Sequence, residues 1–157
     1  MAERKVSTER VIAASPARIF DVLADPAMHP VIDGSGSVRG ELKGNPKRLA
    51  LGSRFGMAMH LGFPYPIRNT VVEFEDGRLI AWCGFNKHQW RFELEPVEDA
   101  SGVEKTRVIE TFDWSTARFP PSIEWMGFPK RNLPGMVKTL VRLQQHFASD
   151  AATAGSS

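Results

Sequence analysis

Residues 88–115, "HQWRFELEPVEDASGVEKTRVIETFDWS", contain the clearest alternation of polar and apolar side chains in this chain. The first half of this stretch alternates between polar and apolar side chains, and one face of the predicted strand carries His88, Trp90, Phe92 and Leu94. The turn signal "EDASG" follows, and the second half alternates again, with one face formed by Thr106, Val108, Glu110, Phe112 and Trp114. Two such strands joined by a short turn favour antiparallel pairing.

Glu110 is the one carboxylate in an otherwise mostly apolar row. A carboxylate on an inner sheet face must be hydrogen-bonded, paired or protonated, because a lone buried charge is costly. Arg68 and His88 are the expected partners, since both fall on faces assigned inward. Four interpretations remain: a position near a sheet edge, a structural ion pair, a polar anchor for a ligand, or a general base.

The chain before this hairpin begins with a predicted strand, "KVSTERVIAA", residues 5–14. A helix is predicted for "SPARIFDVLAD", with Ser15 as N-cap, Pro16 in the first turn and Asp25-Pro26 as the end. "PAMHPVID" predicts a second short helical piece. Residues 34–52 read as a loop with one weak strand around residues 38–42.

Further strands are predicted between residue 53 and the hairpin, separated by the turn signals "GFPYP", "EDGR" and "GFNK". The runs are "SRFGMAMHLG", with Met57 and Met59 in phase, then "YPIRNTVVEFED" and "RLIAWCGF". In the second run, strict alternation predicts one inward face made of Arg68, Thr70, Val72 and Phe74.

The hydrophobic period changes after "RFPPS". A helix is predicted from about residue 122 to residue 148, with an apolar stripe of Met136, Leu140, Leu143 and Phe147. Pro129 and Pro134-Gly135 are expected to break or kink its first half. Residues 149–157 are small and polar and are expected to form a flexible tail, which leaves a single domain at residues 1–148.

Composition narrows the class of function. The 157 residues carry a net charge of only +2 with no long basic tract, so nucleic-acid binding is not expected. The lone Cys83 cannot form an internal disulfide, and no signal peptide or membrane-spanning run is found, so we expect a cytoplasmic protein without stable membrane insertion. No metal-ligand spacing, nucleophile elbow or dinucleotide fingerprint is present, so no metal and no cofactor are expected.

The order of these elements resembles the helix-grip fold of the START-like, or SRPBCC, superfamily, and within it the bacterial polyketide cyclase/dehydratase-like branch. The resemblance runs from about Val6 to Phe147 and rests on "ASPARIFDVLADP", "VVEFEDGRLIAW", "WRFELEP" and "VIETFDWS". It implies an α+β domain: a curved antiparallel sheet of six or seven strands wrapped around a long C-terminal helix, with two short helices after the first strand. The superfamily includes carriers, receptors and cyclases, so the fold does not fix the activity.

The resemblance also implies a pocket for a small hydrophobic molecule between the inner sheet face and the helix. Carried onto this chain, its ligand-binding residues are Met57, Met59, Arg68, Trp82, His88, Trp90, Glu110, Phe112, Trp125, Phe128, Met136 and Leu140, with Trp125 and Phe128 at the mouth. The leading hypothesis is binding of a lipid, polyketide or related metabolite by a monomer or homodimer.

The alternative is a cyclase/aromatase-like or dehydratase-like enzyme in which Glu110 or His88 moves a proton and Arg68 stabilises an enolate-like oxygen. A third hypothesis is an interaction protein whose pocket is filled, with exposed aromatic residues near Trp125 as its contact surface.

Overall fold

Residues 4–98 and 100–155 are described by the computed structural model of this chain. Their strands form one antiparallel sheet of seven, in the order β1-β7-β6-β5-β4-β3-β2. The strands are β1 (Lys5–Ile12), β2 (Val38–Glu41), β3 (Arg54–His60), β4 (Pro64–Glu75), β5 (Leu79–Cys83), β6 (Gln89–Val97) and β7 (Lys105–Asp113). The helical segments are α1 (Pro16–Leu23), the 3-10 turn η1 (Pro26–Met28), α2 (His29–Ile32), α3 (Pro120–Trp125) and α4 (Phe128–Gly155).

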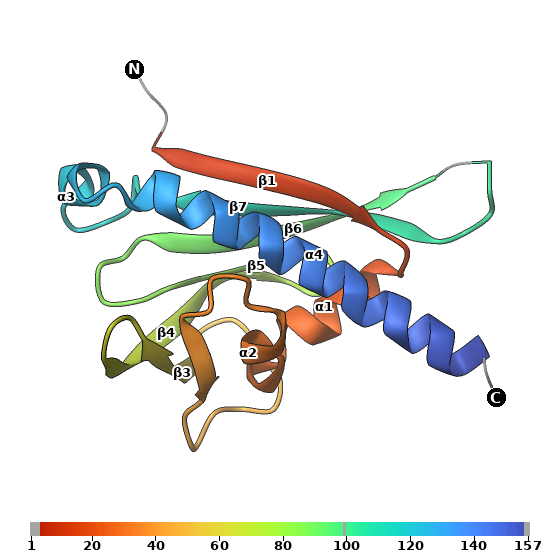
Figure 1. Cartoon of the computed structure of the whole chain (residues 1–157), viewed down its shortest axis with the longest axis horizontal. Coiled ribbons are helices and arrows are strands. Elements are labelled where there is room, and N and C mark those ends of the chain that lie inside the picture. The colour runs from red at the N-terminus through yellow and green to blue at the C-terminus, as the bar shows by residue number, and fades with distance from the viewer. Residues whose placement is uncertain (1–3, 99, 156–157) are drawn as a thin grey trace.

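The long helix α4 lies along one face of the sheet, as Figure 1 shows, and packs against β1, β7 and α2. The hairpin predicted from residues 88–115 is present as β6 and β7, with Phe92 paired to Glu110. The first strand, β1, pairs with the other side of β7 and places Thr8 opposite Glu110. The predicted α+β helix-grip architecture is therefore confirmed, with seven strands.

The helix α1 follows the signals in its sequence. The side chain of Ser15 accepts a hydrogen bond from the backbone N–H of Arg18 at 3.2 Å, and Pro16 occupies the first helical position. The face that α1 buries against the sheet consists of Ile19, Phe20, Val22 and Leu23. The second helical piece is also present, as η1 and α2, and Asp25 caps it by accepting from the N–H of Ala27 at 3.0 Å.

The C-terminal helix differs from the prediction in where it breaks. The stretch is divided at Met126-Gly127 into α3 and α4, and Gly127 has a φ of 76°, a left-handed conformation that glycine adopts without strain. Pro129 lies in the first turn of α4, where its missing N–H costs no helical hydrogen bond, so the break predicted there was wrong. The helix is also continuous through Pro134 and runs on to Gly155, past the predicted end at residue 148.

The loop between α2 and β2 crosses α4 at very short range. A Cβ atom added to Gly34 would lie 2.4 Å from Cβ of Lys138 and 2.5 Å from the carbonyl oxygen of Gly135, so only glycine fits there. The backbone N–H of Gly34 donates to Oγ1 of Thr139 at 2.9 Å, and that hydroxyl donates to the carbonyl of Gly135 at 2.9 Å. These contacts hold the loop against the first half of α4.

The inner face of the sheet has two halves. We call the region around α1 and the second half of α4 the packed half, because its side chains fill the space between helix and sheet. Its buried members include Ile12, Ile19, Phe20, Leu23, Leu49, Ile80, Leu94, Val108, Leu143 and Phe147. We call the region around the first half of α4 and the α2–β2 loop the open half.

Candidate functional site

The open half contains a cavity of about 1130 Å³. Its walls are the inner faces of β3 to β7, the α2–β2 loop and the first half of α4. Pockets that bind small molecules in proteins commonly measure about 300–1,000 Å³. The space is therefore large enough for a sizeable organic molecule.

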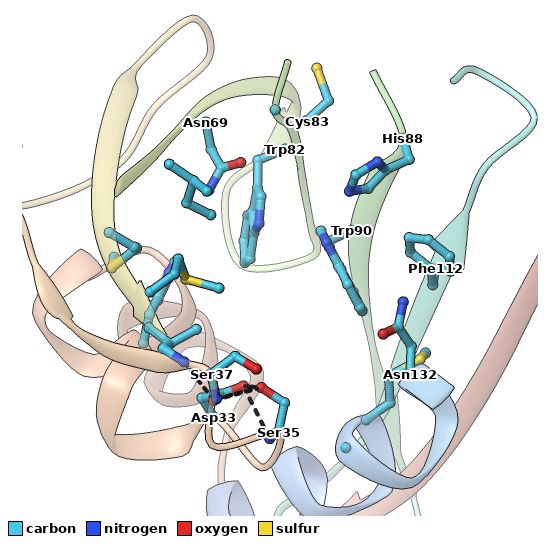
Figure 2. A pocket seen from close by; sticks show the side chains of 18 of the residues that line it. Asp33, Ser35, Ser37, Asn69, Trp82, Cys83, His88, Trp90, Phe112 and Asn132 are labelled. Carbon is cyan, nitrogen blue, oxygen red and sulfur yellow. Dashed lines mark hydrogen bonds between the residues drawn. The ribbon is translucent and has the colours of Figure 1, made fainter. Parts of the chain in front are cut away.

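Aromatic side chains form the middle of the cavity wall. Trp82 on β5 and Trp90 on β6 are directly paired across the two strands, and Figure 2 shows both indoles projecting into the space. The ring of Phe112 lies 4.7 Å from that of Trp90, and the ring of Phe55 lies 5.6 Å from that of Trp82. These rings present flat apolar surfaces of the kind that bind aromatic or aliphatic ligands.

His29 lines the same cavity, although no sequence pattern indicates a site at this residue. Its Nε2 donates to the carbonyl of Leu23 at 2.8 Å, and its ring stacks on Trp82 with a centroid distance of 4.9 Å. Burial lowers the pKa of His29 below its ordinary value, and the bond to Leu23 only partly opposes that effect. A neutral imidazole therefore extends the aromatic wall at neutral pH.

Glu110 is the most unusual group in the cavity. The residue is only 4 % exposed, and its Oε2 has no hydrogen-bond partner. Burial raises the pKa of Glu110 well above its ordinary value, and the negative charge of Asp33 raises it further. The carboxyl group is therefore stabilised in its protonated, neutral form, in which its O–H can donate a hydrogen bond.

Two of the interpretations offered for Glu110 do not fit the structure. The residue is not at a sheet edge, because β7 lies between β1 and β6. Among the described residues the carboxyl group forms no ion pair, so neither Arg68 nor His88 is its partner. The ligand-anchor and proton-transfer interpretations remain.

Arg68 lies on the opposite face of the sheet from the one predicted. The β3–β4 register pairs Phe55 with Asn69 and Gly56 with Arg68, so Asn69 shares the inner face and Arg68 does not. Arg68 still borders the cavity at the strand position beside Asn69, but its side chain is exposed. The predicted alternation failed because a β-bulge between Val71 and Glu73 shifts the phase of β4.

The bulge explains why the predicted inner face of β4 is wrong before it and correct after it. Before it, the inner face of β4 carries Asn69 and Val71, and Val71 pairs with Trp82. After it, Phe74 pairs with Ile80 and is inward again. Phe74 was therefore assigned correctly, whereas Thr70 and Val72 lie out of phase with the inner face.

His88 stands just before β6, at the far end of the aromatic wall from Glu110. Its Nδ1 is buried and has no hydrogen-bond partner, and its ring lies 5.3 Å from that of Phe112. Burial lowers the pKa of His88 below its ordinary value, which favours the neutral ring at neutral pH. In Figure 2 the ring lies on the cavity side of its strand.

Polar groups that the sequence did not indicate come from the α2–β2 loop and from α4. The carboxylate of Asp33 accepts from Oγ of Ser35 at 2.9 Å and from the backbone N–H of Val38 at 3.2 Å. Asn132 projects from α4 toward Phe112 in Figure 2. In the sequence, Asp33-Gly34 indicates only the end of the short helical piece "PAMHPVID", because no local pattern reveals that the following loop folds back over α4.

The residues predicted to bind a ligand fall into three groups. Nine of them border the cavity with inward positions on the sheet or with places on α4: Met57, Met59, Trp82, His88, Trp90, Glu110, Phe112, Phe128 and Met136. Arg68 borders it from the opposite face. Trp125 and Leu140 are not among the lining residues: Trp125 is 89 % exposed on α3, and Leu140 is buried in the packed half.

Residues 4–98 and 100–155 contain neither a metal-binding cluster nor a membrane-spanning helix. No group of three or more His, Cys, Asp or Glu side chains in that part of the chain is arranged to hold a metal ion. None of its helices combines the length and the apolar character needed to cross a membrane.

The sheet, its long helix and the cavity between them define a helix-grip fold, which two solved structures share. A START superfamily protein from Mycobacterium smegmatis has the same fold, with a TM-score of 0.64, 18% identity, and 90% of this chain and 97% of the other covered. An AHSA1-like protein from Aeromonas hydrophila gives a TM-score of 0.60 at 17% identity, with 94% of each chain covered.

The chain belongs to the family described as polyketide cyclase / dehydrase and lipid transport, whose family model matches residues 3–148. It is also 37% identical over 153 residues to an uncharacterized protein of Mycobacterium tuberculosis. That match covers 94% of this chain and 66% of the relative, so the chain spans just under two thirds of the relative's length. The predicted resemblance is confirmed.

Proposed function

We propose that this chain binds one small hydrophobic or aromatic molecule, such as a lipid, a polyketide or a related metabolite, in the cavity between the sheet and α4. The observation that carries the proposal is a cavity of about 1130 Å³ walled by Trp82, Trp90 and Phe112. Side chains that border empty space lose dispersion contacts, and an apolar ligand would supply them. Family membership supports a ligand-binding or cyclase-like role of this kind.

Native mass spectrometry of the chain purified from its own source tests the proposal. We expect a mass increment from a co-purifying small molecule, which organic extraction releases. The variant Met59→Trp fills part of the cavity and should lose the increment. Val72→Trp is the matched control, because Val72 is exposed and out of phase with the inner face. An increment that both variants retain, or that the wild type never shows, contradicts the proposal.

A second candidate function is a cyclase-like or dehydratase-like enzyme. The observation that favours it is Glu110, whose protonated carboxyl group in an apolar cavity suits a general acid or, after deprotonation, a general base. Arg68 takes no part in this candidate, because its side chain is on the other face of the sheet. Of the groups assigned to this reaction from the sequence, Glu110 and His88 line the cavity with inward side chains.

Glu110→Gln separates the two candidates once a co-purifying molecule is in hand. An enzyme should lose turnover of that molecule while still binding it, because the amide keeps the shape of the side chain but not its acidity. A carrier should show only a modest change in affinity and no turnover in either form. A cytoplasmic location and a monomeric or homodimeric state stay predictions from the sequence.

A further inference from the structure

The cavity has an unpartnered polar atom toward each end of its aromatic wall. Oε2 of Glu110 and Nδ1 of His88 are both buried without a hydrogen-bond partner, and both residues line the space. Buried polar atoms in native proteins nearly always have a partner, so an orphan atom on a residue that lines a cavity indicates a missing donor or acceptor. Two orphan atoms in one cavity indicate two missing groups.

The sheet register gives the separation of the two residues. Glu110 is paired with Phe92 on the neighbouring strand, and His88 lies four residues before Phe92 on that strand. Four residues of extended strand span about 13 Å. The two polar groups are therefore far apart along the strands, and one small polar group cannot reach both.

On β5, β6 and β7 the wall between the two polar ends is apolar, while Asn132 projects toward it from α4. Along β6 the inner position between His88 and Phe92 is Trp90, and along β7 the residue that faces Trp90 is Phe112. The two rings are 4.7 Å apart, and Trp82 on β5 is paired with Trp90 on its other side. No charged side chain has its inner position in this stretch of β5, β6 or β7.

From this pattern we propose that the ligand is an elongated, mainly apolar molecule with a hydrogen-bonding oxygen or nitrogen at each end, one bound by Glu110 and the other by His88. The inference rests on the proposed function, because it assigns an orientation and a chemical class to the molecule in the same cavity. A fused-ring or extended aromatic molecule with a hydroxyl or carbonyl group at each end would form both hydrogen bonds. A molecule with a single polar head would form only one of them.

Three rigid probes test the inference: trans-stilbene, its para-hydroxy derivative and its para,para′-dihydroxy derivative. Their affinities for the full chain can be measured by the quenching of tryptophan fluorescence, since Trp82 and Trp90 line the cavity. We expect each added hydroxyl to tighten binding by about tenfold, which is the net gain of one hydrogen bond to an otherwise unpartnered atom. The dihydroxy probe should bind most tightly.

The variants Glu110→Leu and His88→Phe should each remove the gain of one hydroxyl. The dihydroxy probe should then bind either variant no more tightly than the monohydroxy probe binds the wild type. Glu95→Leu makes the same chemical change as Glu110→Leu at an exposed position on β6, and it should leave all three affinities unchanged. Circular dichroism establishes that each variant is folded before its affinities are compared.

The possible results separate this inference from the proposed function. If the three probes bind the wild type equally, or if the gain survives both variants, the two-ended ligand is overturned while apolar binding in the cavity stands. If none of the probes binds, both the inference and the proposed function fail.

Discussion

The two halves of this molecule use the same sheet and the same helix in opposite ways. In the packed half, α1 inserts Phe20 and Leu23 between the sheet and the second half of α4, and both side chains are fully buried. In the open half, the first half of α4 and the α2–β2 loop cover the sheet without filling the space beneath them, and a cavity of about 1130 Å³ remains. Figure 1 shows α1 beneath the second half of α4 only.

The two halves separate a densely packed core from the proposed ligand-binding cavity. Dense packing of apolar side chains stabilises a fold most where the space is filled, so the packed half should contribute most of the hydrophobic stabilisation. The open half instead contains buried titratable groups, which are rare in a packed core. They are the neutral imidazoles of His29 and His88 and the unpartnered carboxyl group of Glu110. Four measurements test whether the two halves differ in this way.

Removing a large side chain from the packed half should have the largest effect. Leu143→Ala should lower the free energy of unfolding by about 2–5 kcal/mol, because Leu143 is fully buried and its neighbours cannot refill the space. Met59→Ala, at the cavity wall, should cost only about 1 kcal/mol, since its partly buried side chain already borders open space. Urea denaturation of both variants measures the two costs, and equal losses would remove the distinction between the halves.

A smaller but substantial loss is expected where the α2–β2 loop crosses α4. Gly34→Ala should lower the free energy of unfolding by about 1–3 kcal/mol, because the new Cβ would lie 2.4 Å from Cβ of Lys138 and must push the loop away. Gly40→Ala is the matched control, since a Cβ there meets nothing within 4 Å. The same denaturation experiment applies, and an unchanged midpoint for Gly34→Ala would show that the loop is not pinned to the helix.

The pH dependence of the free energy of unfolding should report the raised pKa of Glu110. Because the pKa of Glu110 is raised in the folded state, the folded chain binds a proton at Glu110 more tightly than the unfolded chain does. Wild-type stability should therefore fall relative to Glu110→Gln as the pH rises from about 4.3, the ordinary value for Glu, through the raised pKa. His29 and His88 are present in both proteins and cancel in the difference. Denaturation curves between weakly acidic and neutral pH measure this gap, which should not widen if Glu110 is solvated or paired.

The sequence predicted the fold well because the fold depends on local periodicity. The alternation of residues 88–115 gave the β6–β7 hairpin, and Ser15, Pro16 and Asp25-Pro26 marked the limits of α1. These signals lie within a few residues of the structure they specify. The position of Glu110 on the inner face followed from the same alternation.

The rest of the site depends on features that no local pattern contains. The bulge at Val71–Glu73 reversed the assignment of Arg68, since one extra residue exchanges the two faces of a strand. The contribution of His29 and Asp33 depends on a loop that reaches α4 across more than a hundred residues of sequence, from Gly34 to Thr139. The volume of the cavity depends on how far the α2–β2 loop and α4 stand from the sheet, which only the folded chain determines.

The indole NMR signals of the four tryptophans report directly whether a ligand binds in the open half. Trp82 and Trp90 line the cavity, whereas Trp125 is 89 % exposed on α3 and Trp114 is buried without lining it. A ¹⁵N-correlated NMR titration of the full chain with trans-stilbene should shift the indole signals of Trp82 and Trp90 most and leave that of Trp125 unchanged. Shifts at Trp125 alone, or no shifts at saturating probe, would contradict the claim that the open half of this molecule is a ligand-binding cavity.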